Sequence, residues 1–305
     1  MFNMVLDIII MLIAPFLMLG IIKKTKAFLS GRKGVKLIQP FFDFIKLLKK
    51  DCVYSSTTSW IFKAYPIVYL ATVVFAALIV PYSVGKPILE IPFTFIFFAY
   101  ILSFGKFFSL LAALDTGSSF EGMGASREAC FSTIIEPAFF VMMGSIAVLS
   151  NNYTFDSIKL IFNNSGIYGY IIVALSVLTL FIMMLIESCR VPVDDPTTHL
   201  ELTMIHEVMI LDNSGIDLAL ITWASGMKMV ILMSLITNLI IPFNSDIKIS
   251  ILAFVGIFIL LSIAIGTIES AIARLRMSHV FEFIFVMSSF ALVIASLVAV
   301  KIYGV

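Results

Sequence analysis

The sequence contains little charge. Only 13% of its 305 residues are Asp, Glu, Lys or Arg, whereas soluble globular domains carry about 25%. This places the chain outside the soluble class, and a formal net charge of +1 excludes a strongly basic nucleic-acid-binding protein. Apolar residues dominate instead, because 61% of the chain is hydrophobic and its mean hydropathy is +1.10. This composition is typical of an integral membrane protein.

Cysteine is also scarce. Cys52, Cys130 and Cys189 are scattered along the chain, and no two of them have the spacing of a zinc or iron-sulfur ligand motif. We therefore predict no disulfide, no metal site and no cofactor bound by this chain alone.

Eight apolar runs are long enough to cross a bilayer, which takes about 20 residues per helix. They are too long and too uniformly apolar for barrel strands, so we predict helices. The runs lie approximately at 4–22, 65–82, 92–114, 131–149, 167–186, 218–241, 249–268 and 280–302. We find no soluble domain and no internal repeat, so the expected fold is a single all-α polytopic membrane domain over residues 1–305.

The basic residues predict the orientation in the cell membrane. Ten of the twenty Lys and Arg residues directly follow the first run, so the positive-inside rule places that connection in the cytoplasm. No Lys or Arg precedes the run and no cleavage site follows it, so we expect a retained helix rather than a signal peptide. Eight crossings then place both termini outside, with cytoplasmic loops at about 23–64, 115–130, 187–217 and 271–279.

An amphipathic helix is expected in the first cytoplasmic loop. The stretch LIQPFFDFIKLLKK at 37–50 places Gln39, Asp43 and Lys46 on one polar stripe, and Pro40 suits a first helical turn. We expect this helix to lie on the cytoplasmic surface. Binding of anionic lipid headgroups and docking of a protein partner both remain open interpretations of its polar side.

Ionisable residues within or at the ends of the apolar runs are functional candidates, because burying a charge in a bilayer costs about 2.5–3.5 kcal/mol. Lys106 and Lys228 lie too deep to reach water easily, so we expect them to face the bundle interior and pair with carboxylates or water. For Glu136 and Glu282, a carboxylate at a helix end that reaches water is an open alternative. The candidate ion-path residues are Lys106, Glu136, Glu187, Lys228, Glu269 and Glu282.

The most polar stretch is ESCRVPVDDPTTHLELTMIHEVMILDNSG at 187–215. His199 and His206 share a helical face beside Glu207, yet the stretch lacks the H-E-x-x-H zinc pattern, and hydrogen-bonded or interface histidines are favoured over ligands. We expect a helix from Thr197 or Thr198 to about Leu211, ended by Gly215. No nucleophile context is present. The glycine-rich segment 117–126 lacks the Lys of a phosphate-binding loop and is predicted to be a turn.

These motifs carry a family resemblance. E-x-x-R-x-P-x-D-x-P at Glu187–Pro196 and Q-P-x-x-D-x-x-K-L at Gln39–Leu47 resemble the quinone-site membrane subunit of respiratory complex I. D-P-x-T-H-L-E-L-T-M-I-H-E, with L-D-T-G at 114–117, G-M-G-x-S-R-E at 122–128 and E-P at Glu136, is similar to the homologous subunit of group 4 membrane-bound [NiFe]-hydrogenases. The latter include formate hydrogenlyase and the energy-converting hydrogenases. The resemblance covers essentially the whole chain.

The resemblance implies an ion-translocating membrane anchor of a hydrogenase complex, with no catalytic residue on this chain. It places the [NiFe] centre and [4Fe-4S] clusters on partner large and small subunits, beside antiporter-like membrane subunits and lipid. It assigns Glu136 to a lateral proton path and Gln39, Asp43 and Lys46 to a docking helix. The implied docking loop contains Arg190, Asp194, Asp195, His199, Glu201, His206, Glu207 and Asp212.

Two other functions are considered. A complex I-type quinone oxidoreductase subunit would have a tunnel between the first, sixth and seventh helices. A secondary transporter acting alone would show internal repeats and interrupted helices in matching positions, and the sequence has no such symmetry. The sequence leaves open whether the ion is H⁺ or Na⁺ and which molecule donates electrons.

Overall fold

The computed structural model describes all residues except 1, 83–86, 156, 196–203, 242–246 and 304–305. The described residues form helices and no strands. In chain order the helices are α1 (Phe2–Leu29), α2 (Gln39–Leu48), α3 (Trp60–Ile79), α4 (Thr94–Asp115), α5 (Ser119–Ser150), α6 (Ser157–Glu187), α7 (His206–Met209), α8 (Gly215–Ile240), α9 (Ile247–Ala271) and α10 (Met277–Tyr303).

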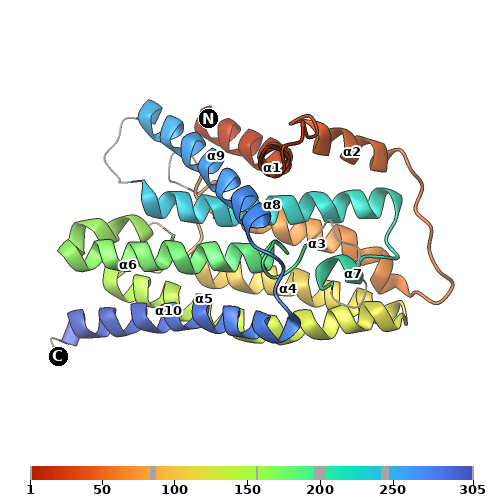
Figure 1. The fold of residues 1–305 in the computed structure, drawn as a ribbon. Coiled ribbons are helices and arrows are strands. Elements are labelled where there is room, and N and C mark those ends of the chain that lie inside the picture. The colour runs from red at the N-terminus through yellow and green to blue at the C-terminus, as the bar shows by residue number, and fades with distance from the viewer. Residues whose placement is uncertain (1, 83–86, 156, 196–203, 242–246, 304–305) are drawn as a thin grey trace.

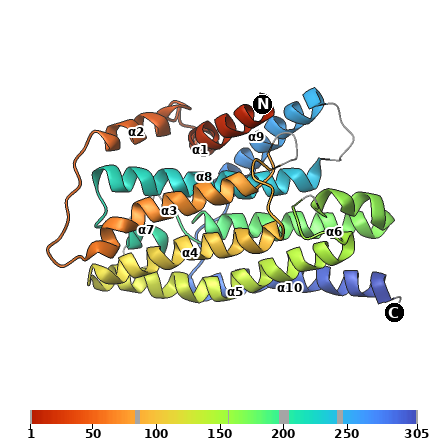
Figure 2. The ribbon, with the colours of Figure 1, turned by 180° about the vertical axis from the view of Figure 1, so that it is seen from behind.

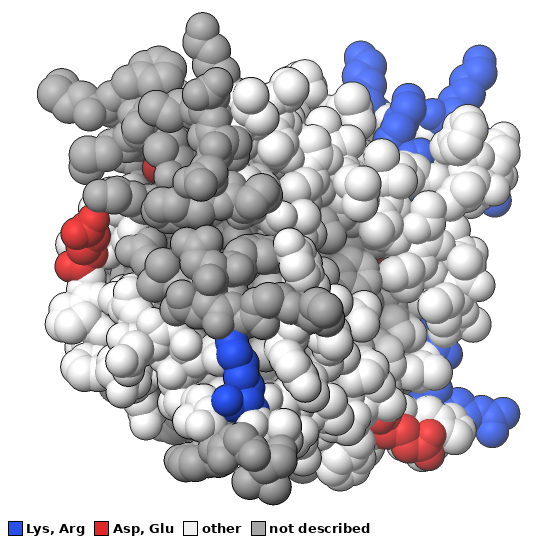
Figure 3. Space-filling view, turned by 90° about the vertical axis from the view of Figure 1, so that its left-hand side faces the viewer, with Lys and Arg blue, Asp and Glu red and all other residues white. Residues whose placement is uncertain are grey.

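Eight of these helices are long and apolar enough to cross a membrane, which confirms the predicted all-α fold with eight spans. They are α1, α3, α4, α5, α6, α8, α9 and α10. They run side by side, while α2 and α7 lie toward the end opposite the C-terminus (Figures 1 and 2). Seen from the C-terminal end, the described surface carries few charged side chains, mostly at its rim (Figure 3). The orientation in the membrane stays a prediction.

The helix α8 lies at the centre of the bundle. In its most apolar stretch 78% of the residues are buried, against 28–56% in the other seven spans. It packs against α1, α2, α3, α6 and α9. A charged side chain in the buried part of α8 therefore has to find its partner on a neighbouring element, because lipid and water are both out of reach.

The predicted amphipathic helix is confirmed as α2, with Pro40 in its first turn and a hydrogen bond of 2.8 Å from Gln39 Nε2 to Asp43 Oδ1. Its apolar side packs against α1 and α8, where the rings of Phe16 and Trp223 lie 5.3 and 5.4 Å from that of Phe44. In Figures 1 and 2, α2 follows the direction of the bundle beside the first half of α8. Lys46 remains exposed on its polar side.

The prediction of a turn at 117–126 is wrong. Residues from Ser119 onward belong to α5, after an extended N-cap at Ser118. A glycine is needed at position 124 of this helix because another segment packs directly on it. A Cβ at Gly124 would overlap the side chain of Val208 and lie 2.8 Å from the carbonyl oxygen of Ile205. The cytoplasmic connection expected at 115–130 is thus mostly helical.

The helix predicted from 197 to 211 also needs correction. Its first part lies outside the described residues, and the described part contains only the single turn of α7. Gly215 does not end that helix but begins α8, with a positive φ of 54°. A side chain there would also clash with the carbonyl groups of Lys50 and Asp51, so glycine lets the loop after α2 approach closely.

Candidate functional site

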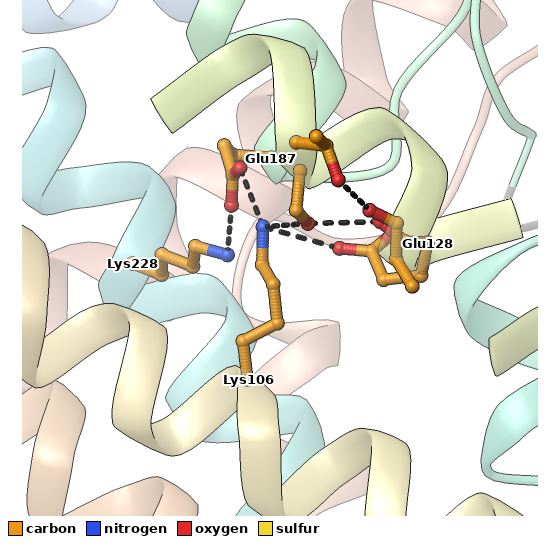
Figure 4. Close-up of polar contacts among 7 residues, drawn as sticks. Lys106, Glu128, Glu187 and Lys228 are labelled. Carbon is orange, nitrogen blue, oxygen red and sulfur yellow. Dashed lines mark hydrogen bonds and ion pairs between the residues drawn. The ribbon is translucent and has the colours of Figure 1, made fainter. Parts of the chain in front are cut away.

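A group of charged side chains is buried where α4, α5, α6 and α8 meet (Figure 4). Lys106 Nζ on α4 lies 2.7 Å from Glu187 Oε1 at the end of α6 and 3.3 Å from Glu128 Oε1 on α5. Lys228 on α8 binds the second oxygen of Glu187. We call these four residues the buried charge cluster. The prediction that Lys106 and Lys228 face the interior and pair with carboxylates is confirmed.

The cluster is shielded from solvent yet formally neutral. The exposed fractions of the side chains are 10% for Lys106, 16% for Glu128, 6% for Glu187 and 8% for Lys228. Lys106 also donates to Ser132 Oγ at 2.9 Å, and that hydroxyl donates to the carbonyl oxygen of Glu128 at 2.8 Å. Each charged side chain is paired with one of opposite charge, and such pairing is what allows charged groups to be buried in an apolar interior.

A cavity of about 30 Å³ adjoins the cluster. Lys106, Glu187 and Lys228 line it together with the half-buried Glu136 of α5, and apolar side chains such as Phe139 close it. A water molecule needs about 10–15 Å³ of such space and several polar neighbours. The cavity therefore has the size and lining to hold water between Glu136 and the cluster, which can carry a proton between them.

A second charged group surrounds Glu269 of α9, whose carboxylate is fully buried. It lies 3.0 Å from Lys26 Nζ on α1 and 3.2 Å from a guanidinium nitrogen of Arg190, just after α6. Three segments distant in sequence are joined here. Because Arg190 follows Glu187 by three residues, the end of α6 links this group to the buried charge cluster.

Beside Glu269 lies a larger cavity of about 550 Å³. Its walls come from α1, α2, α8 and the segment after α6, and both apolar and ionisable side chains contribute. Phe16, Phe44, Leu47, Trp223 and Met229 are among the apolar ones, and Lys26, Asp43, Arg190, His206, Glu207 and Glu269 among the ionisable ones.

The loop after α6 is organised by Asp194, which is fully buried. Its carboxylate pairs with Arg274 at 2.9 Å and accepts backbone N–H bonds from Asp195, Ile205 and His206 at 2.9, 3.0 and 3.3 Å. In addition, the N–H of Leu275 donates to the carbonyl of Pro192 at 2.9 Å. The loop is therefore fixed to the connection between α9 and α10. His199 and Glu201 lie outside the described residues.

The cysteine in this loop is not placed for redox chemistry. Cys189 is 9% exposed, and burial raises the pKa of its thiol well above the usual value. The reactive thiolate form is therefore disfavoured. Within the described part of the chain, no three His, Cys, Asp or Glu side chains gather as metal ligands.

Glu282 and Asp212 also lie apart from the buried charge cluster, and one member of the cluster was missed. Glu282 is 73% exposed at the start of α10 and contacts His279 at 3.0 Å, as expected for a carboxylate at a helix end. Asp212 is exposed and donates its backbone N–H to Glu121. Glu128 was missed because its segment was assigned to a loop, although helical spacing from Glu121 was a usable signal.

The fold and the site define an eight-span helical membrane protein with ion pairs buried in its bundle. The chain belongs to the NADH dehydrogenase family, whose model matches residues 2–300. This confirms the resemblance to complex I subunits that the sequence motifs indicated.

Individual relatives come from two kinds of complex. Hydrogenase-4 component C of Escherichia coli (strain K12) is 27% identical over 88% of this chain and 86% of its own length. Formate hydrogenlyase subunit 4 of the same organism is 25% identical over 88% and 89%. NADH-ubiquinone oxidoreductase chain 1 of Triticum aestivum is 23% identical over 71% and 67%.

A solved structure has the same fold. A chain of the membrane-bound sulfane sulfur reductase, an archaeal respiratory membrane complex, superposes with a TM-score of 0.78 at 16% identity. The match covers 96% of this chain and 97% of that one.

Proposed function

We propose that this chain is the ion-translocating membrane anchor of a membrane-bound [NiFe]-hydrogenase complex. Its cytoplasmic end docks the hydrogenase large and small subunits, which hold the [NiFe] centre and the [4Fe-4S] clusters. Electron transfer in those subunits drives H⁺ or Na⁺ through this chain toward antiporter-like membrane neighbours. The chain is then part of an oxidoreductase without being catalytic alone, and it binds no cofactor itself.

The buried charge cluster carries this proposal. Replacing buried ion pairs by well-packed apolar residues is often neutral or stabilising, so stability alone gives little reason for two Lys and two Glu among four helices. Alternating charges beside a cavity of water size provide stepwise binding sites for a proton or cation. The similarity to hydrogenase-4 component C and formate hydrogenlyase subunit 4 favours a hydrogenase as the coupled enzyme.

Docking is proposed for the end of the molecule that holds α2 and α7. The loop residues Asp195, His206, Glu207 and Asp212 contribute to this surface, together with Gln39, Asp43 and Lys46 of α2. Arg190 and Asp194 hold the docking loop in place from beneath it. Because Asp194 and Glu269 tie the loop to the bundle, a movement imposed by a docked redox subunit is transmitted to Glu187 through the end of α6.

The Glu136→Gln variant tests the ion path. We expect it to assemble normally and evolve hydrogen while gradient formation falls by roughly a hundredfold, because an amide of the same shape cannot bind and release a proton. Hydrogen evolution and dye-reported gradients in inverted membrane vesicles measure the two activities. The Glu90→Gln variant makes the same change at an exposed site outside the cluster and is the control. Normal pumping by Glu136→Gln would remove this residue from the path.

Purification of the tagged chain from native membranes tests the choice of partner. We expect it to elute with nickel- and iron-containing subunits and to evolve hydrogen. A monodisperse chain recovered without metalloproteins under mild detergent would contradict the hydrogenase assignment.

The larger cavity favours a second candidate function, a quinone site. It lies among α1, α8 and Glu269 of α9, the first, sixth and seventh spans, where the quinone alternative predicts a tunnel, and its 550 Å³ lies in the usual range for ligand sites. Inhibition of the purified complex by quinone analogues, relieved by narrowing the cavity with Gly226→Leu, would support this alternative. Equal activity with and without the analogues would exclude it.

A further inference from the structure

Glu121 is a buried acid that the ion path described above does not include. It lies in the first turn of α5 and is 0% exposed. Oε1 accepts the backbone N–H of Asp212 at 3.1 Å, whereas Oε2 has no hydrogen-bond partner among the described residues. The nearby Thr116 hydroxyl donates to the carbonyl of Ala113 instead. No described Lys, Arg or His forms an ion pair with Glu121.

Glu121 stands in line with the buried charge cluster. It precedes Glu128 by seven residues on the same helix, which is two turns, so both carboxyl groups project from one face of α5. The rise of a helix separates them by about 10 Å along its axis. Glu128 contacts Lys106 (Figure 4). Glu121 therefore extends the chain of ionisable groups toward the end of the molecule that holds α7.

The proposed docking loop covers Glu121. The backbone N–H of Asp212 donates to the Glu121 carboxyl group, and Arg127 of α5 donates to the carbonyl of Met204 at 2.9 Å. At Gly124, the absence of a side chain lets α7 pack closely against α5. Residues 204–212 thus lie along the first turns of α5, between Glu121 and the exterior.

Further buried polar atoms without partners lie on Asn213, the residue after Asp212. It is 5% exposed, and among the described residues neither its amide nitrogen nor its amide oxygen has a hydrogen-bond partner. Buried polar atoms are nearly always satisfied, so unpaired ones mark a place for water. The unsatisfied oxygen of Glu121 therefore marks a place for water beside this residue, and the amide of Asn213 marks another in the adjoining loop.

The surroundings of Glu121 differ from those of Glu128 and Glu187. Glu121 is buried without a cation partner among the described residues, whereas each of the other two carboxylates faces a lysine. The N–H of Asp212 and the start of α5 place partial positive charge beside its carboxyl group. Glu121 can therefore take up and release a proton without breaking an ion pair.

We propose that Glu121 is the proton-binding site at the docking end of the ion path and passes protons to Glu128 through water. This inference rests on the proposed function. The Glu121 carboxyl loses its proton to the Glu128 carboxylate, which weakens the pair between Glu128 and Lys106 and shifts Lys106 toward Glu187. Movement of residues 204–212 by the docked subunits then admits the next proton from the cytoplasm to Glu121.

The Glu121→Gln variant of the complete complex tests this role. Gln keeps an acceptor for the N–H of Asp212 but carries no acidic proton, so we expect assembly to persist and gradient formation to fall by roughly a hundredfold. The infrared band of a protonated carboxyl group should disappear. Glu121→Asp should recover part of the gradient and shift the band, which a merely structural role would not produce. Glu90→Gln, exposed and remote, should leave both measurements unchanged.

The outcomes separate this inference from the function on which it rests. If Glu121→Gln pumps normally while Glu187→Gln does not, Glu121 is not the entry site and the ion path stands. If both variants pump normally, the proposed ion path falls as well. Should Glu121→Gln fail to assemble, the infrared band of Glu121→Asp decides: an unshifted band overturns the proposal.

Discussion

Replacing Glu187 by Gln is expected to abolish ion movement and to lower the free energy of unfolding by about 3–5 kcal/mol. Each oxygen of this carboxylate binds one lysine: Oε1 pairs with Lys106 at 2.7 Å, and Oε2 pairs with Lys228. A neutral amide would leave two buried ammonium groups with one remaining carboxylate, that of Glu128. Uncompensated buried charge is far more costly than a lost surface pair, because water cannot reach it.

Stability and transport can be measured separately on this variant. Thermal unfolding of the purified complex in detergent reports stability, and vesicle gradients report transport. In the double variant Glu187→Gln/Lys228→Met, Lys106 keeps Glu128 as its partner, so we expect much of the stability to return while transport stays lost. A Glu187→Gln complex that is as stable and as active as the parent would show that the cluster is neither paired nor used for transport.

The second large effect is expected from Gly20→Ala. A Cβ at Gly20 of α1 would overlap the carbonyl oxygen of Leu37 and lie 2.8 Å from its carbonyl carbon. Because these are backbone atoms ahead of α2, no side-chain rotation relieves the overlap, and α2 must move away from α1. Overpacking of this kind costs about 1–3 kcal/mol. It would also widen the larger cavity, which α1 and α2 both line.

Tryptophan fluorescence can follow this displacement. Trp223 packs against Phe44 of α2 at 5.4 Å, and the chain has only one other tryptophan, Trp60. In a Trp60→Phe background, Gly20→Ala should shift the emission of Trp223 to the red as water enters. Gly256→Ala is the matched control, because nothing lies within 4 Å of a Cβ there. Equal spectra and equal melting temperatures for the two variants would contradict the close contact.

Local sequence patterns correctly predicted the helices that depend on composition. They failed for the segments whose structure depends on packing against distant parts of the chain. The eight spans and α2 follow from apolar runs and from the polar stripe with Pro40. The segment 117–126 looked like a turn because glycine is a poor helix former. In the structure, Gly124 instead lets α7 pack tightly on α5, and this contact cannot be read from neighbouring residues.

The sequence by itself determined that this is an eight-span membrane protein and that Lys106 and Lys228 must find partners inside the bundle, because charge in an apolar medium has no other stable state. Only the tertiary structure decided which partners these are. Glu187 lies 81 residues from Lys106, and Glu128 and Glu121 face inward only because the start of α5 is helical. Such pairings depend on how distant helices pack and rotate against one another, which local periodicity does not encode.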